Sequence, residues 1–199
     1  MYNKGISKEN LGEYPKALHA LFLALSLMPK SLKTYKAIAR VSRKNKSFLN
    51  AIDFYNKAIT KFSLEAPLYA EKADILRKIK EYDKAIAAYD SALHLDSSNI
   101  EYFKNRAQIK YYTGDIQDAI NDYNGAAAQN SKDCEIYAQR AFYKFEKKNY
   151  ESAKDDYSAA IRLNPDKAHF YFMRAAVEKL INQEEQSKKD FDKAHYLGL

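Results

Sequence analysis

The residues of this chain most able to do chemistry are an acidic pair, one cysteine and four histidines. Asp155 and Asp156 stand side by side in the segment YESAKDDYSAAIRLNP, residues 150–165. Adjacent carboxylates can act as general acid and base when both reach one substrate. Similar segments stand upstream, as YDKAIAAYDSALHLDS at residues 82–97 and YPKALHALFLALSLMP at residues 14–29. This recurrence indicates a repeated structural element rather than a single catalytic site.

The cysteine and the histidines have no suitable partners in sequence. Cys134 is predicted to begin a helix, where the thiol could be activated, but no histidine stands near it in sequence and a packing or surface role is favoured. Metal-ligand spacing is missing from the four histidines, His19, His94, His169 and His195. Gly-rich phosphate loops and nucleophile elbows are also missing. We therefore expect no enzymatic activity, no catalytic residues, no metal site and no cofactor.

Composition predicts a helical protein that folds without disulfides. Hydrophobic residues make up 46% of the chain, with only five glycines and four prolines, which disfavours disorder and turn-rich β folds. One cysteine excludes an internal disulfide and suits a reducing compartment. The apolar run at residues 17–28 is shorter than the roughly 20 residues of a membrane span. Its register with the repeat favours a helix over a signal-peptide core, so we expect a cytoplasmic protein without a membrane contact.

The chain repeats every 34 residues without an insertion. Small residues recur at Ala17, Ala51, Ala85, Ala119, Ala153 and Ser187. Four residues later stand Leu21, Tyr55, Tyr89, Tyr123, Tyr157 and Phe191, and three after those stand Ala24, Ala58, Ala92, Ala126, Ala160 and Ala194. Spacings of four and three place these positions on one stripe of a helix that lets a neighbour approach closely.

Another helix is predicted upstream of each stripe, and it is the first helix of each repeat. The stripe of this helix begins at Met1, Tyr35, Tyr69, Phe103, Tyr137 and Tyr171, and a small residue follows four residues later at Gly5, Ala39, Ala73, Ala107, Ala141 and Ala175. Short polar turns join the two helices at Gly12-Glu13, Lys46-Ser47, Lys80-Glu81, Gly114-Asp115, Lys148-Asn149 and Asn182-Gln183. Six helix–turn–helix repeats therefore cover the chain.

This pattern resembles the tetratricopeptide repeat family, and the fifth repeat shows it best, with Tyr137, Ala141, Tyr150, Ala153, Tyr157, Ala160 and Pro165. The resemblance implies an all-α solenoid that winds into a right-handed superhelix. We expect one domain over residues 1–199, with repeats at 1–31, 32–65, 66–99, 100–133, 134–167 and 168–199. Departures include serine in place of the closing proline at Ser63, Ser97 and Ser131.

The acidic pair is explained by a feature of the last three repeats. Asp156 has counterparts at Asp122 and Asp190, and the same repeats carry an arginine in the first helix: Arg106, Arg140 and Arg174. The first three repeats lack both residue types at these positions. We predict ion pairs between the two helices of each hairpin, with contacts between neighbouring repeats as the alternative.

The second helix of the first repeat carries two apolar residues where the others are largely polar. Phe22 and Leu23 align with Asn56-Lys57 and Asp90-Ser91. They are predicted to face outward, where a second copy or another protein would cover them. A homodimer through the N-terminal repeat is one expectation.

By resemblance, first-helix positions away from the core line a concave groove that binds an extended peptide or a partner helix. The candidate residues are Lys33, Lys36, Arg40, Arg43, Arg77, Lys104, Gln108, Tyr111, Phe142, Phe145 and Phe172. Residues 1–65 hold 12 basic and 4 acidic residues, a balance of +8 within a net charge of +7. Such a cluster attracts acidic segments. A solvated lysine-rich face, and a core role for the aromatic residues, are the alternatives.

These features favour a non-enzymatic scaffold that binds a protein or peptide, with an acidic segment near the second repeat. The chaperone-tail clamp of the family is missing, because the positions after Lys36 and Lys104 lack its Lys and Asn pattern. One alternative is an RNA-binding helical repeat protein that uses residues 33–46, which the neutral remainder of the chain disfavours. The other is an interaction module of a larger enzyme or secretion-system component.

Overall fold

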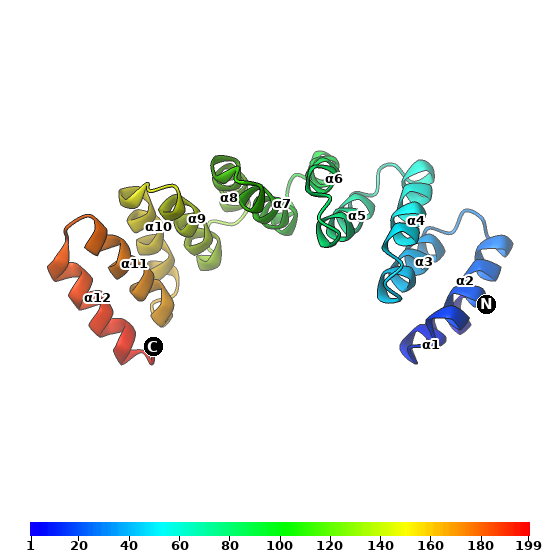
Figure 1. The fold of residues 1–199 in the computed structure, drawn as a ribbon, viewed down its shortest axis with the longest axis horizontal. Coiled ribbons are helices and arrows are strands. Elements are labelled where there is room, and N and C mark those ends of the chain that lie inside the picture. Colours follow the sequence, from blue (N-terminus) through cyan, green and yellow to red (C-terminus); the bar gives the residue numbers. More distant parts are fainter. The chain divides into compact units, whose positions relative to one another are not determined.

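The computed structural model describes all 199 residues as twelve α-helices joined by short turns, without β-strands (Figure 1). The helices are α1 (Tyr2–Asn10), α2 (Tyr14–Leu27), α3 (Leu32–Lys44), α4 (Phe48–Lys61), α5 (Ala66–Lys78), α6 (Tyr82–Leu95), α7 (Ile100–Thr113), α8 (Ile116–Gln129), α9 (Cys134–Glu146), α10 (Tyr150–Leu163), α11 (Ala168–Leu180) and α12 (Glu184–Tyr196). Each predicted hairpin is present, so the predicted all-α repeat fold is confirmed.

The turn inside each hairpin has one geometry in all six repeats. A single residue takes the left-handed conformation, with φ between 60° and 93°: Gly12, Lys46, Lys80, Gly114, Lys148 and Asn182. Its N–H donates to a carbonyl three residues back, and the next N–H donates to a carbonyl five residues back, as in Gly12 to Glu9 and Glu13 to Lys8. These two bonds form a Schellman motif that satisfies the last carbonyls of the first helix.

Packing divides the chain into an N-terminal half, residues 1–97, and a C-terminal half, residues 98–199. This division falls two residues before the predicted boundary between the third and fourth repeats. In the N-terminal half, hairpins α1–α2, α3–α4 and α5–α6 follow one another, with α2 against α3 and α4 against α5. In the C-terminal half, α8 packs on α9 and α10 on α11 in the same manner.

The predicted stripes form the core of both halves. The alanines at the first small position, from Ala17 to Ala153, are buried, and so are the large residues that follow them four residues later, from Leu21 to Tyr157. Ser187 takes the alanine position in α12 and stays satisfied, because its hydroxyl donates to the carbonyl of Ala175 at 2.9 Å. Phe191, at the end of the series, is only half-buried. Small side chains at these positions allow the helices to lie close together, which is what stacking of the hairpins requires.

Candidate functional site

The structure gives the acidic pair a structural role. Asp156 lies between α9 and α10, where its carboxylate accepts hydrogen bonds from Nε and Nη2 of Arg140 at 2.7 and 2.6 Å. Lys144 Nζ lies 2.7 Å from the same carboxylate, whose side chain is only 8% exposed. Asp155 is exposed. Asp156 therefore joins the two helices through Arg140 and Lys144, and Asp155 takes no part in this contact.

The same ion pair occurs in all three C-terminal repeats, as predicted. Arg106 Nε lies 3.0 Å from Asp122, and Arg174 Nε lies 2.6 Å from Asp190, each within one hairpin. The hydrogen bond to Asp156 raises the pKa of Arg140 above its ordinary value. These bidentate contacts are charge-assisted, and they fix the angle between the two helices.

Two of these arginines also connect neighbouring repeats. The third nitrogen of Arg140 donates to Oδ1 of Asn124 on α8 at 3.0 Å, and that of Arg174 donates to the hydroxyl of Ser158 on α10, also at 3.0 Å. Each guanidinium therefore holds its own hairpin together and ties it to the second helix of the repeat before.

The sixth repeat contains a buried carboxylate without a full set of partners. Lys110 and Lys144 support the aspartates of the fourth and fifth repeats, and Glu178 occupies their position in the sixth. Glu178 lies 3.8 Å from Arg174, and its buried Oε2 accepts no hydrogen bond. Burial, and then the negative charge of Asp190, raise the pKa of Glu178.

In the N-terminal half, an ion-pair cluster centres on Glu9 of α1. Arg40 donates from Nε and Nη2 to the two carboxylate oxygens at 2.8 and 2.7 Å, and Lys44 lies 2.8 Å away. These bonds lower the pKa of Glu9 to about 2. Our sequence reasoning missed this cluster. Glu9 occupies the repeat position of Arg43 and Arg77, so an acidic residue in a basic series was the available signal.

The candidate basic residues of the second repeat border a polar pocket of about 310 Å³ between α3, α4 and α5, lined by Lys36, Arg40, Arg43, Tyr55, Glu71 and Asp74. Glu71 accepts a hydrogen bond from the Tyr55 hydroxyl at 2.8 Å and lies 3.0 Å from Lys36 Nζ. Burial, together with the charge of Glu71, raises the pKa of Tyr55. Lys36 and Arg40 are therefore already engaged with carboxylates of the chain itself.

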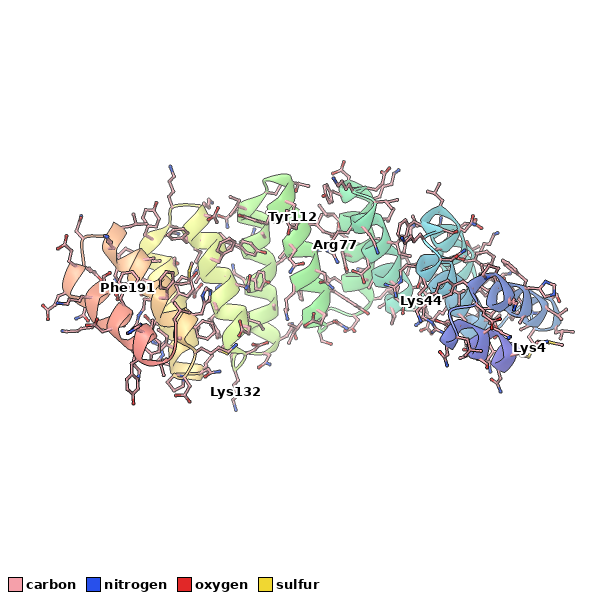
Figure 2. All side chains as sticks on the ribbon, turned by 60° about the horizontal axis from the view of Figure 1, so that its bottom comes forward. Lys4, Lys44, Arg77, Tyr112, Lys132 and Phe191 are labelled. Atoms are coloured by element: carbon pink, nitrogen blue, oxygen red, sulfur yellow. The ribbon has the colours of Figure 1, made fainter.

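Two guanidinium groups in this region are less fully paired. Arg43 is exposed and has no carboxylate at ion-pair distance. Arg77 of α5, labelled in Figure 2, lies 3.9 Å from Asp74, and its buried Nε has no hydrogen-bond acceptor. Lys33 lies apart from the pocket, with its Nζ 5.0 Å from the ring centre of Tyr2.

In the C-terminal half, the candidate aromatic residues pack largely on one another and on the core. The rings of Tyr111 and Phe142 lie 5.6 Å apart, and both are half-buried against the core of α7–α9. Phe145 packs 5.7 Å from Tyr150. Phe172 is more exposed and meets Phe191 edge-on at 5.5 Å. Packing thus occupies most of the surface of three of these four rings.

The two polar candidates of the fourth repeat lie at the surface of α7. Lys104 Nζ lies 2.8 Å from Glu101, one turn earlier on the same helix. Gln108 is exposed. Gln108 is therefore accessible to a ligand, whereas Lys104 is half-buried and paired with Glu101.

Phe22 and Leu23 are 46% and 41% exposed on α2. The ring of Phe22 packs 5.5 Å from that of Phe54 on α4, so it serves as a contact between the first two repeats. Leu23 borders a separate hollow at the N-terminal hairpin.

No group of three His, Cys, Asp or Glu side chains is arranged to hold a metal ion. Cys134 is half-buried against the core of α9–α11. None of the helices has both the length and the apolar character needed to cross a membrane.

Comparison with known families identifies the repeat. The model of the tetratricopeptide repeat matches residues 66–99 and 135–167, which are the third and fifth repeats. A search of curated proteins found no match.

Solved structures share the fold at low sequence identity. MamA is 18% identical with a TM-score of 0.76, over 85% of this chain and 93% of MamA. YrrB, described as a TPR protein with an unusual peptide-binding site, is 18% identical with a TM-score of 0.74, over 90% and 92% of the two chains. PilF of Pseudomonas aeruginosa is 18% identical with a TM-score of 0.69, over 94% and 85%. Two repeats therefore match in sequence, all six match in fold, and the resemblance of this chain to the tetratricopeptide repeat family is confirmed.

Proposed function

We propose that this chain is a non-enzymatic scaffold that holds a segment of another protein against its first helices. An acidic part of that segment would lie at the second and third repeats, in the pocket between α3 and α5. The polar character of this pocket carries the proposal. The likeness to YrrB, a TPR protein with a peptide-binding site, supports it.

Among the cations that line the pocket, Arg43 is best suited to receive an acidic side chain. The other two cations of the pocket, Lys36 and Arg40, already contact Glu71 and Glu9 at 3.0 and 2.7 Å. Arg43 has no such contact, and Arg77 has a buried N–H without an acceptor. A ligand carboxylate would give the exposed Arg43 guanidinium the charge-assisted hydrogen bonds that it lacks. The Nε of Arg77 is buried and lies outside the lining of the pocket, so a ligand there would not reach it.

In the C-terminal half, the candidate binding residues on the first helices are mostly aromatic rather than basic. Gln108 and Phe172 are exposed, and Tyr111, Phe142 and Phe145 are half-buried beside them in the first helices. A partner segment there would bring apolar side chains, because aromatic rings contribute mainly through buried area.

A binding titration with fluorescent peptides tests the acidic preference. An Asp- and Glu-rich peptide should bind more tightly than a Lys-rich peptide of equal length, and added salt should weaken its binding. Arg43→Glu should lower the affinity roughly tenfold or more, since a repulsive contact replaces an attractive one. Lys61→Glu is the matched control, because it makes the same charge change on α4 away from the pocket. Equal affinity for the two peptides, or equal losses for the two variants, would refute the proposal.

Binding of RNA through residues 33–46 is the second candidate. Three cations of this stretch are engaged with carboxylates: Lys36 with Glu71, and Arg40 and Lys44 with Glu9. These contacts leave fewer free cations along this stretch for a series of phosphate groups. A steep fall in random RNA binding as salt rises would favour the RNA candidate.

A further inference from the structure

The N-terminal hairpin carries a second hollow, separate from the pocket between α3 and α5. It lies between α1 and α2 and has a volume of about 490 Å³. Met1, Ala20 and Leu23 supply apolar surface, and Lys4, Lys8 and Lys16 stand around it. Met1 is 57% exposed. Lys4 is labelled at this hairpin in Figure 2.

The third repeat shows which helix packs on the equivalent face of its own hairpin, α5–α6. The third repeat has an equivalent hollow of about 480 Å³. Its lining residues stand two repeats, or 68 positions, after those of the first hollow: Tyr69 corresponds to Met1, Lys72 to Lys4 and Ser91 to Leu23. The difference is that α4, the second helix of the preceding repeat, forms one side of it. This is the face on which a hairpin receives the second helix of the repeat before it.

The helix that lies on the third repeat has a defined side-chain pattern. α4 contributes Leu49, Ile52 and Asn56 to the hollow, which are two apolar residues three apart and a polar residue four further on. The equivalents of Asn56 in later repeats are hydrogen-bond acceptors. Asn124 and Ser158 accept from the arginines that stand at the position of Lys4, each at 3.0 Å.

Charge indicates which kind of helix the first repeat would accept. Lys8 and Lys16 share one counter-ion, Glu13, at 3.1 and 2.8 Å. Lys4 has no ion-pair partner, and α2 contains no acidic residue. The surroundings of the hollow are therefore basic, which disfavours a second copy of the same face and favours an acidic occupant.

We propose that the α1–α2 face is a docking site for an acidic amphipathic helix. That helix would carry apolar residues at i and i+3, and a carboxylate at i+7. The apolar residues would lie beside Met1 and Leu23, as Leu49 and Ile52 border the hollow of the third repeat, and the carboxylate would pair with Lys4. This site is independent of the proposed peptide pocket at α3 and α5.

The test uses a peptide that copies α4, residues 48–61, held helical by a side-chain crosslink because so short a helix is marginal alone. The acidic probe carries Asn56→Asp, Lys57→Glu and Lys61→Glu, and the parent peptide is the comparison. The acidic probe should bind the intact chain roughly tenfold more tightly or better. Leu23→Asp should weaken that binding at least roughly tenfold, and Lys4→Glu should reverse the preference between the two peptides. Leu27→Asp is the matched control, because Leu27 is exposed on α2 outside the hollow.

Each outcome supports or overturns the proposal. Equal binding of the two peptides, or unchanged affinities in both Leu23→Asp and Lys4→Glu, would overturn it. A wild-type dimer in sedimentation that Leu23→Asp converts to monomers would also overturn it, since the occupant would then be a second copy. If circular dichroism shows that Leu23→Asp does not fold, the exposed Lys4→Glu variant still tests the proposal. Arg43→Glu should bind the acidic probe normally, which separates this site from the peptide pocket.

Discussion

Replacing Asp156 by asparagine tests the structural role of the acidic pair most directly. The change keeps the shape of the side chain and removes the charge that Arg140 and Lys144 share. Both cations have side chains only 16% exposed, so water replaces the lost carboxylate poorly. Removing one partner of a buried ion pair costs about 3–5 kcal/mol. The amide oxygen of asparagine retains a hydrogen bond of about 1 kcal/mol, so we expect a loss of about 2–4 kcal/mol.

Urea unfolding followed by circular dichroism would measure this loss. A loss of this size corresponds to a fall in Tm of roughly 9 °C for a chain of this length. Asp155→Asn is the matched control, because Asp155 is the adjacent residue and is exposed. We expect the control to change stability by no more than about 0.5 kcal/mol. Since neighbouring repeats can unfold separately, amide hydrogen exchange in α9 and α10 should localise the effect to the fifth repeat.

Equal stability of the two variants would refute the assignment, because it would mean that the buried carboxylate contributes no more than an exposed one. The physical reason can be checked further with Arg140→Met, Lys144→Leu and Asp156→Leu combined. Removing all three charges should recover most of the lost stability, because no uncompensated charge remains buried.

Three further substitutions follow from the geometry. Glu9→Gln should make the stability of the chain less sensitive to acid, because the pKa of Glu9 is held at about 2. The contribution of Glu9 to the free energy of unfolding, roughly 2–3 kcal/mol, is complete above about pH 5 and disappears as the pH falls toward 2. Urea unfolding across this pH range would measure it. Lys148→Gly should stabilise the chain by about 0.5–1 kcal/mol in urea unfolding, because its φ of 62° is costly for lysine. Glu178→Gln should stabilise the chain by about 1 kcal/mol at neutral pH, since an amide can donate a hydrogen bond to Asp190. Burial raises the pKa of Glu178, so the carboxyl group becomes neutral as the pH falls and the stability gained, measured by thermal unfolding, should shrink.

Each of these substitutions has a control nearby. Glu13→Gln should retain most of the acid sensitivity, because Glu13 is far more exposed than Glu9. Lys147→Gly should destabilise the chain, because Lys147 has a φ of −78° and gains nothing from glycine. Glu184→Gln should give no such gain in stability at neutral pH, because Glu184 is exposed. A variant that matches its control would contradict the corresponding argument.

The repeat in the sequence was sufficient to predict the helices, the turns and the ion pairs inside the last three hairpins. The turn at Lys148 could be predicted because two glycines stand at equivalent positions, Gly12 and Gly114, where the chain needs a left-handed residue. The pair of Arg140 and Asp156 could be predicted because both residue types recur together in three repeats. These contacts join residues 16 apart within one hairpin, and the geometry of the hairpin follows from local spacing alone.

Contacts between hairpins were decided only by the tertiary structure. Glu9 binds Arg40 and Lys44 across two repeats, and these contacts determine how many of the candidate cations in the second repeat remain available to a ligand. Phe22 looked like a free apolar residue, but it packs partly on Phe54 of the next hairpin. Such contacts depend on the distance and rotation between stacked hairpins, which many side chains set together. The sequence therefore predicted the repeated element, and stacking determined which of its charged and aromatic side chains remain exposed.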